Sequence, residues 1–180
     1  EKGSLVHRLY DKGLICMTLN RDNKTGFICS SFDIYHAGYS LMLKYCKDHC
    51  DYLVVGLQDD PSWERKEKNS PIMSLHSRWL ILKSISYIDE IAPYKSEKEL
   101  SNLLNFYTPD IRFLGEDYRN AKKITGLNGS VSPRLVKNIH FVPRSHDYSS
   151  SSIRKEIHKT EKYKEDLKDL SHRNIYMMDD

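Results

Sequence analysis

The sequence contains no apolar run long enough to cross a bilayer, and it does not open with the apolar stretch of a secretion signal. It also lacks a basic stripe: 28 lysines and arginines are balanced by 25 acidic residues, for a net charge of only +3. Nucleic-acid-binding domains usually carry clustered basic residues. We therefore expect a cytoplasmic protein that binds neither a membrane nor a nucleic acid.

Cysteine is scarce and scattered, at positions 16, 29, 46 and 50, in or beside apolar segments. This distribution favours reduced thiols of a cytoplasmic protein over a disulfide framework. Cys46, His49 and Cys50 would need a fourth partner to bind zinc, and the sequence offers none at a suitable spacing. We therefore predict no metal centre built from the protein's own side chains.

A chain of 180 residues is long enough for one domain with a substantial core. We expect an N-terminal arm over residues 1–24, a domain over 25–159 and a charged C-terminal helix or tail over 160–180. Apolar runs alternate with segments of helical periodicity, and Ser74 and Ser96 are placed to cap two helices. This alternation predicts an α/β fold, a five-stranded parallel sheet with helices on both faces. The expected strands are residues 26–30, 52–57, 87–91, 111–115 and 138–142.

Residues 26–39 (GFICSSFDIYHAGY) join an apolar strand to a helix through two serines and an aspartate. At such a junction the backbone N–H groups and the positive end of the helix dipole favour an anion above the strand. His36 and Tyr39 are three residues apart, so on the first helical turn they share one face and project toward that anion. A single histidine near a helix start is more often structural than catalytic. A second phosphate-binding pattern favours the functional interpretation.

That second pattern is the run of four serines at residues 149–152, which follows Arg144 and precedes Ile153. Serine hydroxyls and the free N–H groups of a helix start, with an arginine beside them, form a phosphate-binding nest. A flexible serine-rich linker is the alternative. It is less favoured because the run lies between an apolar strand and an amphipathic segment.

Two further polar segments follow predicted strands. Residues 58–71 are rich in charge and are as readily interpreted as a solvated loop as they are as a binding element. In the second interpretation Lys66 and Lys68 close over a triphosphate, because ligands of open α/β sheets bind beyond the carboxyl ends of the strands. Glu116 and Asp117 follow the fourth predicted strand, which places two carboxylates at the same edge.

Residues 31–39 (SFDIYHAGY) resemble the TFDxxHxGH signature of the cytidylyltransferases, within the HxGH nucleotidyltransferase superfamily, and the glycerol-3-phosphate cytidylyltransferase branch is the closest resemblance. Residues 144–154 (RSHDYSSSSIR) resemble the family's second motif, which ends in IS(S/T)(S/T)xI(R/K). Residues 78–91 are similar to a segment that forms much of the family's homodimer contact. The resemblance spans roughly residues 25–158 and implies a Rossmann-like fold and a homodimer.

The chain departs from the family pattern at two positions. Tyr39 stands where the signature has its second histidine, and Ser86 stands where an arginine usually precedes the Tyr-Val-Asp of the dimer segment. Loss of that guanidinium removes a bidentate clamp or an ion-pair partner, so we expect glycerol 3-phosphate to be a poor substrate. The loop over residues 119–137 is longer than the family's usual connection and is expected to help select another acceptor.

The resemblance implies attack by a phosphate-bearing small molecule on the α-phosphorus of CTP, with release of pyrophosphate and with Mg²⁺ bridging the triphosphate. Such transfer depends on positioning and charge neutralisation, and the residues supply donors and cations rather than a nucleophile–base pair. The expected catalytic residues are His36, Lys66 and Arg144. The expected nucleotide-binding residues are Ser30, Ser31, Phe32, Asp33, Gly38, Tyr39, Lys68, Arg78, Gly115, Glu116, Asp117, Ser145, Ser149 and Ser150.

Two alternatives remain open at the level of the sequence. One is an adenylyltransferase of the same superfamily, since backbone contacts largely select the base. The other is a nucleotide-binding regulatory relative with little turnover, because Tyr39 and Ser86 both depart from the family pattern.

Overall fold

The computed structural model describes residues 23–120 and 138–176, and among these no helix is both long and apolar enough to span a membrane. Its centre is a five-stranded sheet in the order β3-β2-β1-β4-β5, with every neighbouring pair parallel. This confirms the predicted fold class. The strands are β1 (Thr25–Ser30), β2 (Tyr52–Gln58), β3 (Glu90–Tyr94), β4 (Ile111–Gly115) and β5 (Ile139–Val142).

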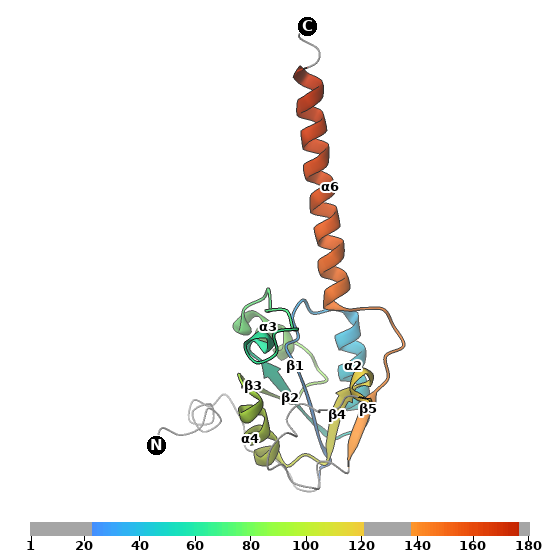
Figure 1. Cartoon of the computed structure of the whole chain (residues 1–180). Coiled ribbons are helices and arrows are strands. Elements are labelled where there is room, and N and C mark those ends of the chain that lie inside the picture. The colour runs from blue at the N-terminus through green and yellow to red at the C-terminus, as the bar shows by residue number, and fades with distance from the viewer. Residues whose placement is uncertain (1–22, 121–137, 177–180) are drawn as a thin grey trace.

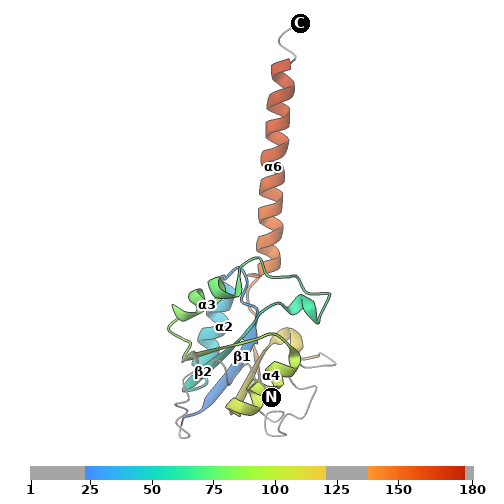
Figure 2. The same cartoon turned by 90° about the vertical axis from the view of Figure 1, so that its left-hand side faces the viewer.

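Helices cover both faces of the sheet (Figures 1 and 2). Helices α2 (Ala37–Lys47) and α3 (Leu75–Lys83) pack on one face, where Leu43 and Leu82 join a core with alternate strand residues such as Val55. Helix α4 (Glu97–Tyr107) packs on the other face through Leu100, against residues such as Phe27. The period-2 alternation of the strands therefore supplies two cores, one on each side of the sheet.

The helix starts that the sequence predicted are confirmed. The Ser74 hydroxyl accepts a hydrogen bond from the N–H of Ser77 at 3.1 Å, and that of Ser96 accepts one from Glu99 at 3.2 Å. Glu99 in turn accepts from the N–H of Lys95 at 2.7 Å. Side-chain oxygens thus satisfy N–H groups that have no partner inside the helix.

The third strand lies three residues later than the sequence predicted, at Glu90–Tyr94 instead of 87–91. The apolar pair Tyr87 and Ile88 packs against the core from the turn after α3, and the N–H of Ile88 donates to the carbonyl of Ile85 at 3.2 Å. Pro93 sits inside the strand, which the sheet tolerates because β3 is an edge strand and needs no N–H on its outer side. Apolarity alone could not separate a packed turn from a strand.

Helix α6 (Ser150–Tyr176) begins beside the sheet and extends away from the domain (Figures 1 and 2). It runs without a break across residues 159 and 160, where the sequence predicted a domain boundary, so the serine run and the charged C-terminal segment belong to one helix. Nearly all of the expected N-terminal arm and of the loop over residues 119–137 lies outside the described residues. Two short 3₁₀ helices, η1 (Pro61–Trp63) and η2 (Glu116–Tyr118), follow β2 and β4.

Strand order reverses between β1 and β4, because β2 and β3 lie on one side of β1 and β4 and β5 on the other. At such a switch point the loops after the two central strands leave in opposite directions and open a crevice at the carboxyl edge. The sheet topology therefore predicts a ligand-binding crevice beyond the ends of β1 and β4.

Candidate functional site

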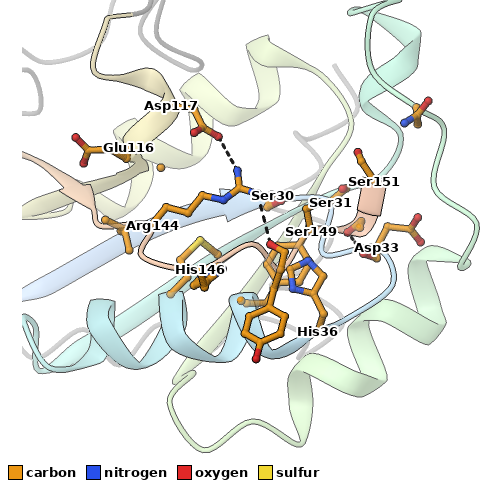
Figure 3. A pocket seen from close by; sticks show the side chains of 18 of the residues that line it. Ser30, Ser31, Asp33, His36, Glu116, Asp117, Arg144, His146, Ser149 and Ser151 are labelled. Carbon is orange, nitrogen blue, oxygen red and sulfur yellow. Dashed lines mark hydrogen bonds and ion pairs between the residues drawn. The ribbon is translucent and has the colours of Figure 1, made fainter. Parts of the chain in front are cut away.

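A pocket of about 370 Å³ lies at this edge, between the loop that joins β1 to α2 and the N-terminus of α6 (Figure 3). It collects residues from four separate segments of the chain, which are the two phosphate-binding patterns, the end of β4 and the loop after η1. The predicted residues that line it are Ser30, Ser31, Asp33, His36, Gly38, Tyr39, Lys68, Gly115, Glu116, Asp117, Arg144, Ser149 and Ser150.

The β1–α2 loop is strained, and Asp33 holds it in place. Phe32 and Ile34, on either side, have φ of 50° and 49°, a left-handed conformation that costs a non-glycine residue on the order of 1–3 kcal/mol. Asp33 is only 3% exposed, and its carboxylate accepts hydrogen bonds from the N–H groups of Ile72 and Met73 at 3.0 and 2.9 Å. These bonds fasten the strained loop to the segment that leads into α3.

The N-terminus of α6 is attached to the same loop. Arg154, on the first turns of α6, donates to the carboxylate of Asp33 and to the carbonyl of Ser70. The Ser150 hydroxyl donates to the Asp33 carbonyl at 2.7 Å, and the Ser149 hydroxyl caps the helix by accepting from the N–H of Ser152 at 3.0 Å. The serine run is therefore a helix start and not a linker. Asp33 fixes both helix N-termini against one pocket.

His36 and His146 approach each other at the start of α2 (Figure 3). A Cβ on Gly38 would lie 2.6 Å from Cε1 of His146 and 3.0 Å from Cε1 of His36, so only glycine leaves room for both rings. The Nδ1 atoms of both histidines are buried and make no hydrogen bond within the described structure. Burial lowers the pKa of His36, and His146 and Arg144 lower it further. These three effects all favour the neutral form of the His36 imidazole.

Tyr39 occupies the position of the second signature histidine and lies against the first. Its ring stacks on that of His36, with centroids 4.3 Å apart and planes inclined by 21°. The other contacts of the ring are with Phe32, at 5.0 Å, and Tyr35, at 5.8 Å. As predicted, His36 and Tyr39 share one face of the first turn, but the tyrosine ring also buttresses the imidazole.

The cationic part of the pocket comes from the β5–α6 connection and the loop after η1. Arg144 donates to Asp117 at 3.2 Å and to the carbonyl of Tyr148 at 3.4 Å (Figure 3). Both partners of the ion pair are exposed, at 42% for the Arg144 side chain and 70% for that of Asp117, so their mutual attraction is weak. A phosphate group entering the pocket can therefore recruit the guanidinium. Lys68 also lines the pocket.

Four predicted site residues do not line the pocket. Lys66 and Ser145 are exposed to solvent, and Phe32 is buried in the core. Arg78 is 2% exposed and donates to the carbonyls of Ser31, Gln58 and Asp59 at 2.7 Å each. Its guanidinium thus ties the end of β1 to the end of β2, a positioning contact that a helical arginine in sequence does not reveal.

Several lining residues were absent from the predicted set, among them His146, Arg154 and Asn69. His146 lies between Arg144 and the serine run, so its place inside a phosphate-binding motif was the available signal. Arg154 closes the same motif, but nothing local indicated that it would reach Asp33 across the fold. Asn69 lies in the charge-rich loop, and its neighbour Lys68 was the only hint.

Residues 27–156 match the model of the cytidylyltransferase-like family. The chain belongs to this family. The match confirms the resemblance inferred from residues 31–39 and 144–154, and with it the enzyme class that the resemblance implied. Both motifs lie inside the matched region, and the structure brings them to one pocket.

Two curated relatives illustrate the range of the family. The bifunctional protein HldE of Helicobacter hepaticus is 30% identical over 141 residues, which cover 78% of this chain and 28% of the relative. The ethanolamine-phosphate cytidylyltransferase of Dictyostelium discoideum is 33% identical over 116 residues, or 62% of this chain and 30% of the relative. The chain thus spans less than a third of the length of these relatives.

A solved structure supports the fold. The lipopolysaccharide core biosynthesis protein from Thermoplasma volcanium superposes with a TM-score of 0.55 at 22% identity, over 69% of this chain and 99% of that one. At this identity the likeness concerns the arrangement of the sheet and helices, and the chemistry rests on the pocket itself.

Proposed function

We propose that this protein transfers CMP from CTP to a phosphate-bearing small molecule and releases pyrophosphate. The observation that supports this most is the convergence of two helix N-termini, α2 with His36 and α6 with Ser149 and Ser150, on one pocket that also holds Arg144. N–H groups, hydroxyls and a guanidinium are the donors that a polyphosphate requires. The resemblance of residues 31–39 to the cytidylyltransferase signature is our reason for proposing CTP over ATP.

In the proposed reaction an oxygen of the acceptor's phosphate forms a bond to the α-phosphorus of CTP. The bond from that phosphorus to the bridging oxygen breaks, and its electron pair leaves with pyrophosphate. His36 is held neutral and donates through its single N–H to an oxygen on which charge builds, while Arg144 and Lys68 neutralise the triphosphate. The stacked ring of Tyr39 keeps the imidazole in place.

Mg²⁺ is part of this proposal as a companion of the nucleotide. The described residues hold no group of three or more histidine, cysteine, aspartate or glutamate side chains suited to a metal ion. Mg²⁺ commonly binds through substrate phosphates with one or two carboxylates, and Glu116 and Asp117 on the pocket wall fit that more modest requirement. When bound, the ion would supply charge neutralisation between phosphates.

Thermal-shift titration and pyrophosphate release test the nucleotide. With magnesium, CTP is expected to raise the melting temperature more than ATP, GTP or UTP, because a ligand that binds only the folded state stabilises it. Pyrophosphate release is then measured with each nucleotide against phospho-alcohols, phospho-sugars and phosphonates. Stabilisation by ATP alone would contradict the cytidylyl assignment, and binding without turnover would favour a regulatory relative.

A homodimer through residues 78–91 is a second part of the proposal. Leu80 on α3 is 51% exposed, and Tyr87 and Ile88 in the following turn are only partly covered by the core. A two-fold symmetric contact would place the same surface on both subunits. Ser86 is exposed in this turn and does not line the pocket described above. A monomer mass by light scattering at micromolar concentration would contradict the dimer.

A further inference from the structure

A second cavity, of about 190 Å³, adjoins the main pocket and shares Ser30, Lys68 and Gly115 with it. We call it the side cavity. The last residues of four strands line it: Ser30 of β1, Gln58 of β2, Tyr94 of β3 and Gly115 of β4. A molecule whose phosphate lies in the main pocket could therefore extend its other end into the side cavity.

Gln58 presents an unused donor at this cavity. The residue is 3% exposed, and its Oε1 accepts a hydrogen bond from Nη2 of Arg65 at 2.8 Å. A guanidinium has donors only, so this bond fixes the orientation of the amide and turns Nε2 away from the arginine. Nε2 is buried and finds no hydrogen-bond partner among the described residues, and the same is true of Nε of Arg65. Buried donors without partners are costly, which indicates that a ligand supplies acceptors here.

The charge of the side cavity has one sign. Arg65 and Lys68 line it, and none of the described residues on its wall is an aspartate or a glutamate. Tyr94 adds no negative charge, because burial raises the pKa of its phenol well above the usual value. Glu97 interacts electrostatically with Arg65 but lies off the wall. An ammonium group would find no counter-ion on this wall, whereas a carboxylate or hydroxyl oxygen would find donors and a cation.

We infer that the side cavity binds the end of the acceptor remote from its phosphate, and that Gln58 and Arg65 select an oxygen-bearing group there over an ammonium group. The inference rests on the proposed function and specifies its acceptor class. The expected order of preference is carboxylate, then hydroxyl, then ammonium. Ethanolamine phosphate, which appears in the name of one relative, is accordingly a poor acceptor for this chain.

Three two-carbon phosphates of similar size test the order: 2-phosphoglycolate, 2-hydroxyethyl phosphate and ethanolamine phosphate. Their binding to the protein loaded with α,β-methylene-CTP and magnesium is measured by calorimetry, which needs no turnover. A Kd at least about tenfold lower for 2-phosphoglycolate than for ethanolamine phosphate is expected, the range by which a single charged or hydrogen-bonded group discriminates. An equal or reversed order, or no binding of any of the three, would overturn the inference.

Pyrophosphate release with CTP is then measured for the same three phosphates and for larger sugar phosphates. If pyrophosphate is not released with any acceptor or any nucleotide, the proposed function is wrong. The order of the three Kd values measured by calorimetry would still test whether the side cavity selects an oxygen-bearing group. The two failures are therefore distinguishable.

Variants of Gln58 and Arg65 test whether these two residues account for the preference among the three phosphates. Gln58→Leu removes the donor at similar volume, and Arg65→Met removes the cation while keeping much of the aliphatic stem. Each is expected to raise the Kd of 2-phosphoglycolate about tenfold and to change that of ethanolamine phosphate much less. Lys44→Met, which removes an exposed cation on α2, is the matched control and should leave both values unchanged.

If Gln58→Leu does not fold, Gln58→Glu is the second variant, because its carboxylate can pair with Arg65. It should reduce the preference for 2-phosphoglycolate over ethanolamine phosphate by about tenfold. Unchanged Kd values in the Arg65 and Gln58 variants would show that the acceptor does not use this cavity.

Discussion

The two helix N-termini that face the pocket are built differently. At α2 the approach is a strained loop, fixed by the buried carboxylate of Asp33, and the N-cap residue His36 makes no side-chain capping bond within the helix. At α6 the start is more exposed, and a serine hydroxyl caps it. Because His36 does not cap α2, its imidazole and the first N–H groups of the helix stay available to a ligand, and the Asp33 contacts hold the loop that carries them. The second start keeps an ordinary serine cap, and the connection that leads into it contributes an exposed cation, Arg144.

This comparison suggests a division of labour. In the proposed reaction, the α2 start places the groups that must not move while charge builds on phosphate, since such donors act best when they are preorganised. The α6 start would supply hydroxyls and a guanidinium that adjust to the triphosphate of the proposed substrate. The ion pair between Arg154 and Asp33 joins the two halves.

Removal of the Asp33 carboxylate, which links the two helix N-termini, should have the largest effect. Asp33→Ala leaves the N–H groups of Ile72 and Met73, as well as Arg154, without their carboxylate. We expect a loss of about 3 kcal/mol in the free energy of unfolding, measured by urea denaturation, because breaking a buried pair strands its partner. Asp48→Ala, which breaks an exposed pair with Lys44, is the control and should cost less than about 0.5 kcal/mol. Similar losses in both variants would show that Asp33 does not join the two halves.

The α2 half is tested next through its two rings. His36→Ala should lower kcat about a hundredfold or more, the effect of losing one preorganised donor. Since His36 makes no capping bond in α2, its removal costs no helix cap, and the unfolding midpoint should change much less than in Asp33→Ala. Tyr39→Phe keeps the stacked ring and removes only the hydroxyl, so we expect kcat to fall about tenfold.

Tyr39→His discriminates between an enzyme and a binding module. If this variant raises the rate steeply while His36→Ala has no effect, the natural protein is better described as a nucleotide-binding module. Steady-state pyrophosphate release provides the measurement for all three variants.

The α6 half should respond more weakly. Ser149→Ala removes the hydroxyl that caps the N–H of Ser152 and lines the pocket, at a cost of about 1 kcal/mol in stability. The Kd of CTP, followed by thermal shift, should rise by less than tenfold. Ser101→Ala, on α4 and outside the pocket, is the matched control. A fall in kcat in Ser149→Ala larger than the one expected from His36→Ala would reverse the proposed division of labour.

The smallest expected effect is a pH dependence from His36. The pKa of His36 is lower in the folded than in the unfolded protein, so between these two values the unfolded chain binds more protons. Its contribution to stability is therefore present above the ordinary histidine pKa and declines as the pH falls through that value toward the folded one. The free energy of unfolding, measured by urea denaturation at several values between pH 7.5 and pH 5, should change less steeply with pH in His36→Gln than in the wild type.

His140, whose pKa is also lowered by burial, contributes with the same sign in both proteins, so it cancels in the comparison. If the free energy of unfolding changes equally with pH in the wild type and in His36→Gln, folding does not lower the pKa of His36.

Sequence patterns predicted most of the polar residues that line the pocket, because donors at helix starts come from short, local stretches of chain. A strand that ends in serines before a helix, and a serine run after an arginine, carry their donors within a few residues of chain. Lys66 and Lys68 could not be told apart in this way. They share one charged loop, and only the folded loop turns Lys68 to the pocket while Lys66 remains at the surface.

By itself, the sequence determined the alternation of strands and helices, the helix caps at Ser74 and Ser96, and the two motifs that identify the family. These depend on hydrophobic periodicity and on contacts between near neighbours. The tertiary structure alone decided the contacts between distant segments: Arg78 on the ends of β1 and β2, Arg154 on Asp33, and Gln58 held by Arg65. A buried polar side chain takes its partner from whatever the fold brings within hydrogen-bond distance, and that choice leaves no periodic trace in the chain.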